Sequence, residues 1–160
     1  MIHLLCGPAA SGKTTLAMAI ERDRGAIRFS IDDRMDPPNF PEQRNDYFIA
    51  QLVERVRPVF IEILKAAELP LSQGKDVVLD VGAFDRQTRH IVRMWAAENK
   101  QLLTLHYLSF SRSIRLERLR QRNECRGSNY SFNVPRWVFD LIDQIFEPPT
   151  DEEEPMIVYR

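Results

Sequence analysis

A chain of 160 residues is long enough for one domain with a full hydrophobic core. Hydrophobic residues (44%) and charged residues (28%) occur at ordinary levels for a globular protein, and a formal net charge of −1 provides no field that would attract nucleic acid. No apolar run approaches the roughly 20 residues of a membrane helix, the N-terminus does not resemble a signal peptide, and two cysteines fit a reducing compartment, so we expect a cytoplasmic protein that acts away from membranes.

Strand-like and helix-like segments alternate along the chain. In chain order, the patterns predict a strand over residues 1–6, a helix over 13–24, a strand over 26–31, a helix over 42–69 that Pro58 kinks or divides, a strand over 77–82, a helix from Asp85 to about 99, a strand over 102–110, helices over 112–122 and 135–146, and a strand over 156–160. This alternation predicts an α/β domain whose parallel sheet is covered on both faces. Ligands of such sheets bind beyond the carboxyl ends of the strands.

The segment GPAASGKT at residues 7–14 fits the P-loop (Walker A) pattern G-x-x-x-x-G-K-T and lies between the first predicted strand and the first predicted helix. Glycines let backbone N–H groups turn inward around a phosphate, and the helix start adds positive potential. Lys13 would reach the β- and γ-phosphates, and the Thr14 hydroxyl would ligate Mg²⁺. We therefore expect ATP and Mg²⁺ to bind at a site made of Gly7, Ala10, Ser11, Gly12, Lys13, Thr14 and Thr15. The alternative is a surface turn before a helix.

Acidic residues follow the next two predicted strands. FSIDDR places Asp32 and Asp33 where a carboxylate would take the proton of an acceptor hydroxyl; Asp32 is the favoured base, and an N-cap or turn role is the alternative. VVLDVG places Asp80 at a strand end, where it would contact Mg²⁺ through water or bond nearby backbone. Because these carboxylates and the glycine loop fall at one edge of the predicted sheet, we expect a phosphoryl-transfer site there.

Six arginines lie within the segment RSIRLERLRQRNECRG. Four of them follow 3-4-4 spacing and would project from one side of a helix: Arg115, Arg118, Arg122 and Arg126. A mobile lid around residues 112–131 would bring Arg122 and Arg126 to the nucleotide. The alternatives are a solvated basic face and a nucleic-acid footprint, and the neutral net charge argues against the latter.

A few other polar residues lie near the predicted rim. Arg86 and Arg89 are predicted to be solvated, close enough to the rim to meet an anionic substrate. Glu147 either meets the nucleoside or belongs to a loop that ends a helix. The histidines have no metal-ligand spacing and are predicted to be structural: His3, His90 and His106.

The motifs GPAASGKTT, FSIDD, VVLDVG and RLRQRNECRG occur in the order and spacing of small P-loop kinases. To about residue 149, the chain resembles the 5′-kinase domain of polynucleotide kinase and related predicted kinases of bacteria, and is more distantly similar to zeta toxins and chloramphenicol phosphotransferase. The resemblance implies a single P-loop NTPase domain over residues 1–160, with three αβα layers and a five-stranded parallel sheet in the order 2-3-1-4-5. It also implies that Lys13 and Thr14 serve ATP and Mg²⁺, that Asp32 is the base, and that Arg122 and Arg126 are lid arginines.

Two departures from that resemblance affect the acceptor site. The polynucleotide kinase pattern has an arginine three residues after the base, which grips the acceptor's phosphate, and Met35 stands there in this chain. Val81 and Gly82 replace the polar residues that usually follow the third strand's aspartate. We therefore predict an ATP-dependent kinase that phosphorylates a hydroxyl of a small molecule or, less favoured, of a polynucleotide end. The alternative is a nucleotide-binding regulatory NTPase with no acceptor.

Overall fold

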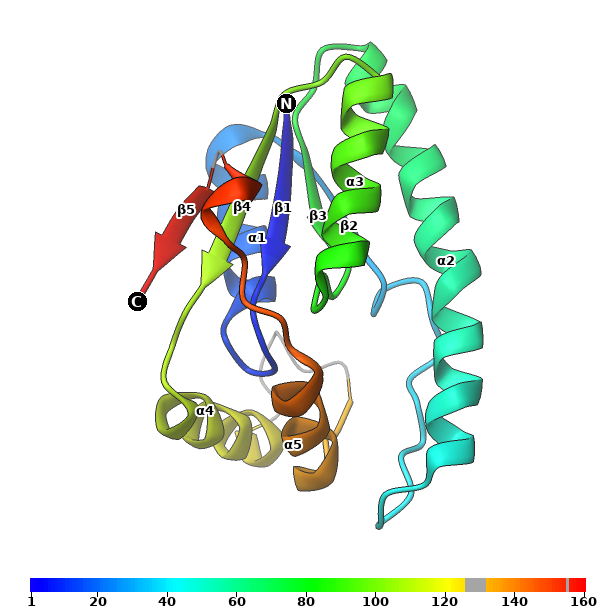
Figure 1. Ribbon diagram of the computed structural model, residues 1–160, viewed down its shortest axis with the longest axis vertical. Coiled ribbons are helices and arrows are strands. Elements are labelled where there is room, and N and C mark those ends of the chain that lie inside the picture. The colour runs from blue at the N-terminus through cyan, green and yellow to red at the C-terminus, as the bar shows by residue number, and fades with distance from the viewer. Residues whose placement is uncertain (126–131, 155) are drawn as a thin grey trace.

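Five parallel strands form one sheet in the order β2-β3-β1-β4-β5 (Figure 1). The computed structural model describes residues 1–125, 132–154 and 156–160. The strands are β1 Ile2–Cys6, β2 Ile27–Ser30, β3 Val77–Asp80, β4 Leu103–Leu108 and β5 Met156–Tyr159. The predicted P-loop NTPase fold and its strand order are therefore confirmed.

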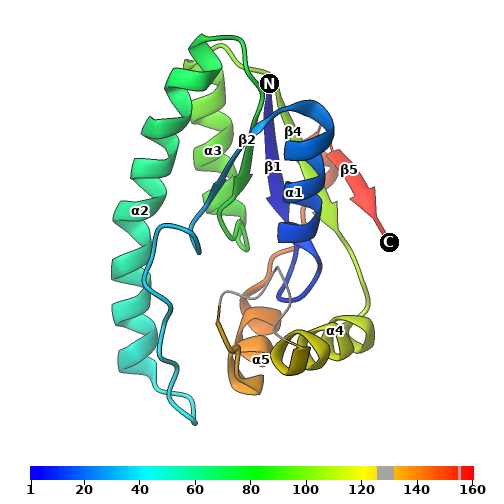
Figure 2. The same ribbon diagram turned by 180° about the vertical axis from the view of Figure 1, so that it is seen from behind.

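Helices cover both faces of the sheet, and two more lie beyond its carboxyl edge (Figures 1 and 2). The helical elements are α1 Lys13–Arg24, α2 Asp46–Ser72, α3 Arg86–Glu98, α4 Arg112–Cys125, α5 Arg136–Ile145 and a short 3₁₀ helix, η1 Asp151–Glu153. α2 and α3 pack on one face, α1 packs on the other, and α4 and α5 lie below the strand ends in Figure 1. No helix in the described ranges has the length and apolar character needed to cross a bilayer.

The alternation of β1 side chains explains this layering. Ile2 and Leu4 point into the cluster shared with α2 and α3, and Leu5 points into the cluster shared with α1. All three side chains are fully buried, as expected for a central parallel strand that is covered on both faces. β1 is thereby fixed in the middle of the sheet, and the loop that follows Cys6 starts from a rigid position.

Of the two predicted outcomes at Pro58, a kink or a division of the second helix, the division is wrong. α2 is one helix from Asp46 to Ser72, with the Asn45 side chain accepting a hydrogen bond from the backbone N–H of Phe48 (3.0 Å) at its start. Pro58 lies on an exposed part of the helix, where water can bind the backbone carbonyl that loses its intrahelical donor. The helix starts four residues later than predicted because Asn45 supplies its cap.

The expectation that Arg89 is solvated is also wrong. Its side chain is fully buried and forms a two-pronged ion pair with Glu153 of η1, with distances of 2.7 Å (Nε–Oε2) and 2.9 Å (Nη2–Oε1). Arg89 lies on the same face of α3 as the buried Val92 and Ala96, so helical periodicity places it toward the core. The pair therefore ties η1, which precedes β5, to α3, although its two residues lie 64 positions apart in the sequence.

Two buried histidines connect β1, β4 and β5, which confirms that His3 and His106 are structural. The His3 Nδ1 atom lies 3.0 Å from His106 Nε2, and His106 Nδ1 lies 3.0 Å from the Tyr159 hydroxyl. Burial lowers the pKa of His106 to about 4, and burial also lowers the pKa of His3. Both rings are therefore neutral at pH 7 and join the strands through neutral hydrogen bonds.

This arrangement predicts an acid-sensitive fold. The unfolded chain takes up a proton on His106 at a pKa near 6.5 and the folded chain only at about 4. The free energy of unfolding should therefore fall as pH drops from 6.5 to 4, by up to about 3 kcal/mol from this residue. Urea titrations over this range should show a smaller loss in His106→Gln than in the natural sequence, with exposed His90→Gln as the control. Equal pH slopes for all three proteins would contradict this role.

Candidate active site

The loop between β1 and α1 turns sharply through three residues with positive φ: Gly7 (154°), Ala10 (58°) and Gly12 (99°). A Cβ atom at Gly7 would lie 2.9 Å from the backbone carbonyl oxygen of Leu108 and 2.7 Å from the Ser11 hydroxyl, so a side chain does not fit there. The described residues offer no hydrogen-bond acceptor to the backbone N–H of Ala10 or of Gly12. Such a loop presents unsatisfied amide hydrogens at the start of a helix, where an anion can bind.

Lys13, the first residue of α1, closes back over this loop. Its ammonium donates hydrogen bonds to the carbonyl oxygens of Gly7 (2.8 Å) and Pro8 (3.0 Å) and lies 5.3 Å from the centre of the Phe84 ring. Burial lowers the pKa of Lys13, and the charges of Asp80 and Asp32 oppose that shift. A phosphate in the loop would favour the charged ammonium in the same way, so we expect Lys13 to transfer from the carbonyls to a bound anion.

Thr14 and Asp80 meet across the gap between α1 and β3. The Thr14 hydroxyl donates a hydrogen bond to Asp80 Oδ2 (2.8 Å), and Asp80 is buried at the carboxyl end of the strand beside β1. Hydroxyl and carboxylate oxygens suit Mg²⁺, which also keeps water and phosphate ligands. Among the described residues, no group of three or more His, Cys, Asp and Glu side chains could hold a metal ion.

Asp32 follows β2 at the same edge of the sheet. Its carboxylate reaches solvent, yet protein atoms crowd it, and this crowding together with the negative charge of Asp80 raises the pKa of Asp32. The positive charges of Lys13 and Arg122 act in the opposite direction. Asp33 is instead ion-paired with Arg28, which favours Asp32 as the carboxylate available at the rim.

The arginines of α4 divide into several roles. Arg115 donates to the Ala9 carbonyl oxygen (3.2 Å), and Arg118 donates to the Ser11 carbonyl oxygen (3.2 Å). Arg122 is close enough to Asp32 for its charge to affect the pKa of that group, and Arg126 lies outside the described residues, as does part of the predicted lid. The sequence did not predict that Arg115 and Arg118 contact carbonyl groups of the loop. The 3-4-4 spacing predicted only that these arginines project from the same side of the helix.

Glu147 has a structural contact. Its side chain accepts a hydrogen bond from the backbone N–H of Arg86 (2.6 Å), and its own N–H donates to the carbonyl oxygen of Phe84 (2.9 Å). The carboxylate therefore lies at the first turn of α3, where negative charge is favourable. This geometry supports the helix-terminating loop over a contact with the nucleoside.

The chain matches a known protein family and resembles solved structures in fold. The AAA domain family matches residues 2–149, and no curated protein matches the chain. A gluconokinase from Sinorhizobium meliloti 1021 is 21% identical, with a TM-score of 0.64 over 98% of this chain and 79% of that one. Kti12 of Chaetomium thermophilum, in complex with ADP-AlF3, is 16% identical (TM-score 0.68; 99% and 88%), and a sugar kinase from Janibacter sp. HTCC2649 is 15% identical (TM-score 0.66; 99% and 83%). At these identities the likeness shows the shared fold.

The close approach of Gly7 to Leu108 gives a prediction about stability. Gly7→Ala should lower the free energy of unfolding by about 2–3 kcal/mol, because the new Cβ would press on a backbone carbonyl that cannot move without shifting β4. The matched control is Gly25→Ala, where φ is +65° but no atom lies within 4 Å, and only the backbone strain of about 1 kcal/mol is expected. Equal losses in chemical denaturation would show that the Gly7 contact is not restrictive.

Proposed function

Because this chain belongs to the AAA domain family and has the P-loop kinase-like fold, we propose that it binds Mg·ATP and transfers the γ-phosphoryl group to a hydroxyl of an acceptor. The observation that carries the proposal is the convergence of Lys13, the Thr14–Asp80 pair and Asp32 on one strand edge. A fold shared with gluconokinase and sugar kinase structures supports a nucleotide-binding phosphotransferase. The more specific likeness to polynucleotide kinase stays a prediction.

In this proposal the loop residues hold the polyphosphate. Backbone amides of Ala10 and Gly12 would donate to phosphate oxygens, Ser11 and Thr15 would line the same loop, and Lys13 would offset the charge of the β- and γ-phosphates. Thr14 would hold Mg²⁺ directly and Asp80 through water. When bound, the cation neutralises phosphate charge and fixes the orientation of the transferred group.

Asp32 is proposed to accept the proton of the acceptor hydroxyl as that oxygen attacks the γ-phosphorus. Its raised pKa brings its basicity closer to neutral pH, where a general base is most useful. Arg122, and Arg126 beyond the described part, would stabilise the charge on the transferring group; both belong to the predicted lid of about residues 112–131, whose first part is held against the loop by Arg115 and Arg118. The whole chain, 1–160, would act as one domain.

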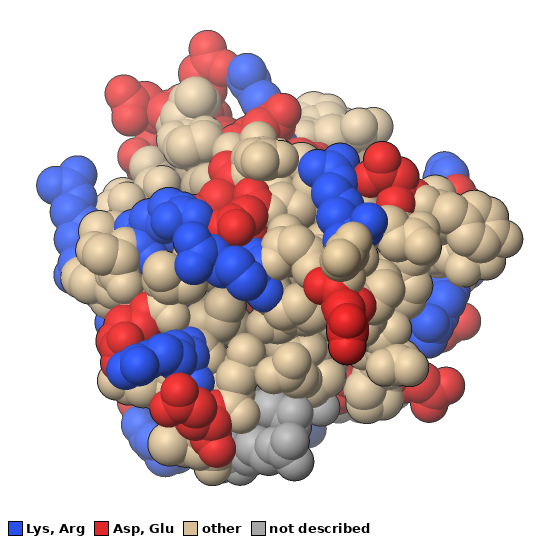
Figure 3. Space-filling model, turned by 90° about the horizontal axis from the view of Figure 1, so that it is seen from below, with Lys and Arg blue, Asp and Glu red and all other residues tan. Residues whose placement is uncertain are grey.

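The acceptor is proposed to carry a hydroxyl on a small molecule rather than on a nucleic-acid end. Figure 3 shows the α4 and α5 end of the molecule, where Lys and Arg side chains are interspersed with Asp and Glu. A surface of mixed charge is a poor match for the negatively charged backbone of a nucleic acid. A screen of phosphoryl transfer from labelled ATP to sugars, nucleosides, antibiotics and oligonucleotide ends would identify the acceptor class.

The first test is nucleotide binding. In calorimetric titrations with Mg·ATP, Lys13→Ala should weaken affinity by about 10- to 100-fold, because one charge-assisted contact to the phosphates is lost. Lys75→Ala is the control, since that lysine is exposed and lies after α2. Equal affinity of Lys13→Ala and the natural protein would remove the basis for a triphosphate site in the loop.

The second test separates catalysis from binding. Asp32→Asn should lower the rate of phosphoryl transfer by about 10²–10⁴-fold while Mg·ATP affinity changes little, because the amide cannot take a proton. In the natural protein the rate should fall as pH drops through the raised pKa of Asp32. Asp33→Asn is the matched control. If Asp32→Asn retains full nucleotide turnover and binds a partner in a nucleotide-dependent way, a regulatory NTPase without an acceptor is the better account.

A further inference from the structure

Two carbonyl groups on the outer side of the phosphate loop are bound by α4. Arg115 Nη1 donates to Ala9 O and Arg118 Nη1 donates to Ser11 O, each at 3.2 Å. In a planar trans peptide, the carbonyl of one residue and the N–H of the next point in opposite directions. Holding the carbonyls of Ala9 and Ser11 toward α4 therefore turns the N–H groups of Ala10 and Gly12 toward the inside of the loop.

The inward orientation of the Ala10 N–H requires a strained backbone conformation at Ala10. With φ of 58°, Ala10 is in the left-handed region, which a residue with a side chain adopts at a cost of about 1–2 kcal/mol. Rotating the Ala9–Ala10 peptide by half a turn would bring φ into the ordinary negative region. The same rotation would turn the Ala10 N–H out of the loop, so an external contact has to hold the peptide in place.

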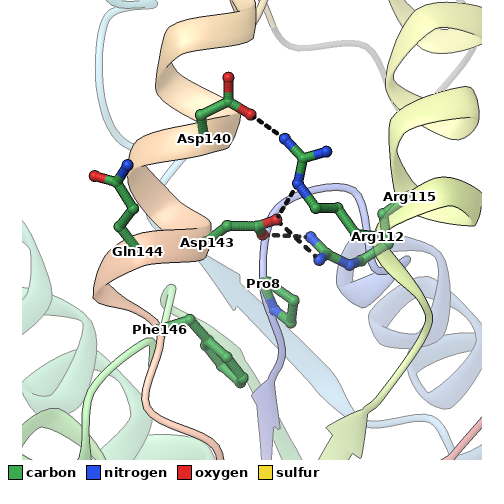
Figure 4. Close-up of a pocket in the computed structure, with 7 residues that line it drawn as sticks. All are labelled: Pro8, Arg112, Arg115, Asp140, Asp143, Gln144 and Phe146. Atoms are coloured by element: carbon green, nitrogen blue, oxygen red, sulfur yellow. Dashed lines mark hydrogen bonds and ion pairs between the residues drawn. The ribbon is translucent and has the colours of Figure 1, made fainter.

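Arg115 is itself fixed on three sides. It is buried, its guanidinium bonds both carboxylate oxygens of Asp143 in α5 (2.6 and 3.1 Å), and its Nε donates to the carbonyl oxygen of Phe110 (3.1 Å). Figure 4 shows Arg112 contacting the same Asp143 carboxylate from the neighbouring turn of α4, at 3.2 Å. Arg115 lies between this anchor and the loop, whereas the ion pairs of Arg112 are with Asp140 and Asp143 of α5 and its guanidinium lies over the Phe139 ring of the same helix.

We propose that Arg115, anchored by Asp143, is a positioning residue that keeps the Ala9–Ala10 peptide turned so that the Ala10 N–H faces the bound phosphates. The inference rests on the proposed function, because it assigns to α4 and α5 the task of organising the ATP loop. It predicts that nucleotide affinity depends on a contact made on the outer side of the loop, away from the nucleotide.

The test is calorimetric titration of Mg·ATP into matched variants of the full chain. Arg115→Met should weaken affinity on the order of tenfold, because the released peptide relaxes by about the strain at Ala10. Arg112→Met is the control: it loses its own bonds to Asp140 and Asp143 but leaves the bond to Ala9 in place, and its affinity should stay within about twofold. Thermal melts of both variants report any general loss of stability.

A second substitution distinguishes positioning from a merely structural role. Glycine adopts positive φ without strain, so Ala10→Gly added to Arg115→Met should restore several-fold of the affinity that Arg115→Met loses, with Ala10→Gly alone as the reference. A purely structural Arg115 predicts no such rescue. If Arg115→Met does not fold, Asp143→Asn, which keeps the shape and weakens the anchor, should show a smaller loss with the same rescue.

The outcomes for the two proposals are separable. If the natural protein does not bind Mg·ATP, the proposed function fails. If it binds and Arg115→Met binds equally well, or Ala10→Gly gives no rescue in whichever variant folds, the positioning role of Arg115 is wrong while the nucleotide site stands.

Discussion

A loop that offers its amide hydrogens to an anion must direct its carbonyl oxygens elsewhere, and those oxygens need donors. In this protein, cationic side chains supply them. Lys13 binds the carbonyls of Gly7 and Pro8, Arg115 binds that of Ala9, and Arg118 binds that of Ser11. Arg115 and Arg118 thus hold the loop backbone in a strained shape from α4, whereas the bonds from Lys13 are those that we expect a bound phosphate to displace.

The rest of the fold brings charge to the same place. The parallel sheet sets β1 beside β3, so Asp80 meets Thr14, and β2 beside β3, so Asp32 follows at the same edge. Behind the loop, the buried Arg89–Glu153 pair joins α3 to η1 and places a guanidinium 3.8 Å from the Cys6 sulfur, just before Gly7. Removing either partner would leave a buried charge unpaired, which is strongly destabilising. The pair therefore holds α3 and η1 together behind the loop.

Local sequence patterns predicted the fold and the centre of the site because both depend on short-range chemistry. Alternating strands and helices gave the α/β class, the motif at residues 7–14 gave the loop, and the resemblance gave the strand order that the structure confirms. The roles proposed for the site residues remain predictions, for Lys13, Thr14 and Asp80 as for Asp32, Arg122 and Arg126. Contacts between distant residues were not predictable: Glu153 lies 64 positions from Arg89, and Ala9 lies 106 positions from Arg115. The acceptor depends on loop side chains, for which no local pattern exists.

The central claim is that the loop after β1 is an amide cradle for a polyphosphate, held open from α4. A crystal structure of the protein with Mg·ADP tests it most directly. The account predicts β-phosphate oxygens within hydrogen-bonding distance of the N–H groups of Ala10 and Gly12, Lys13 moved from the loop carbonyls to the phosphate, and the bond from Arg115 to Ala9 intact. A nucleotide bound elsewhere, or an Ala9–Ala10 peptide turned outward with phosphate in the loop, would contradict it.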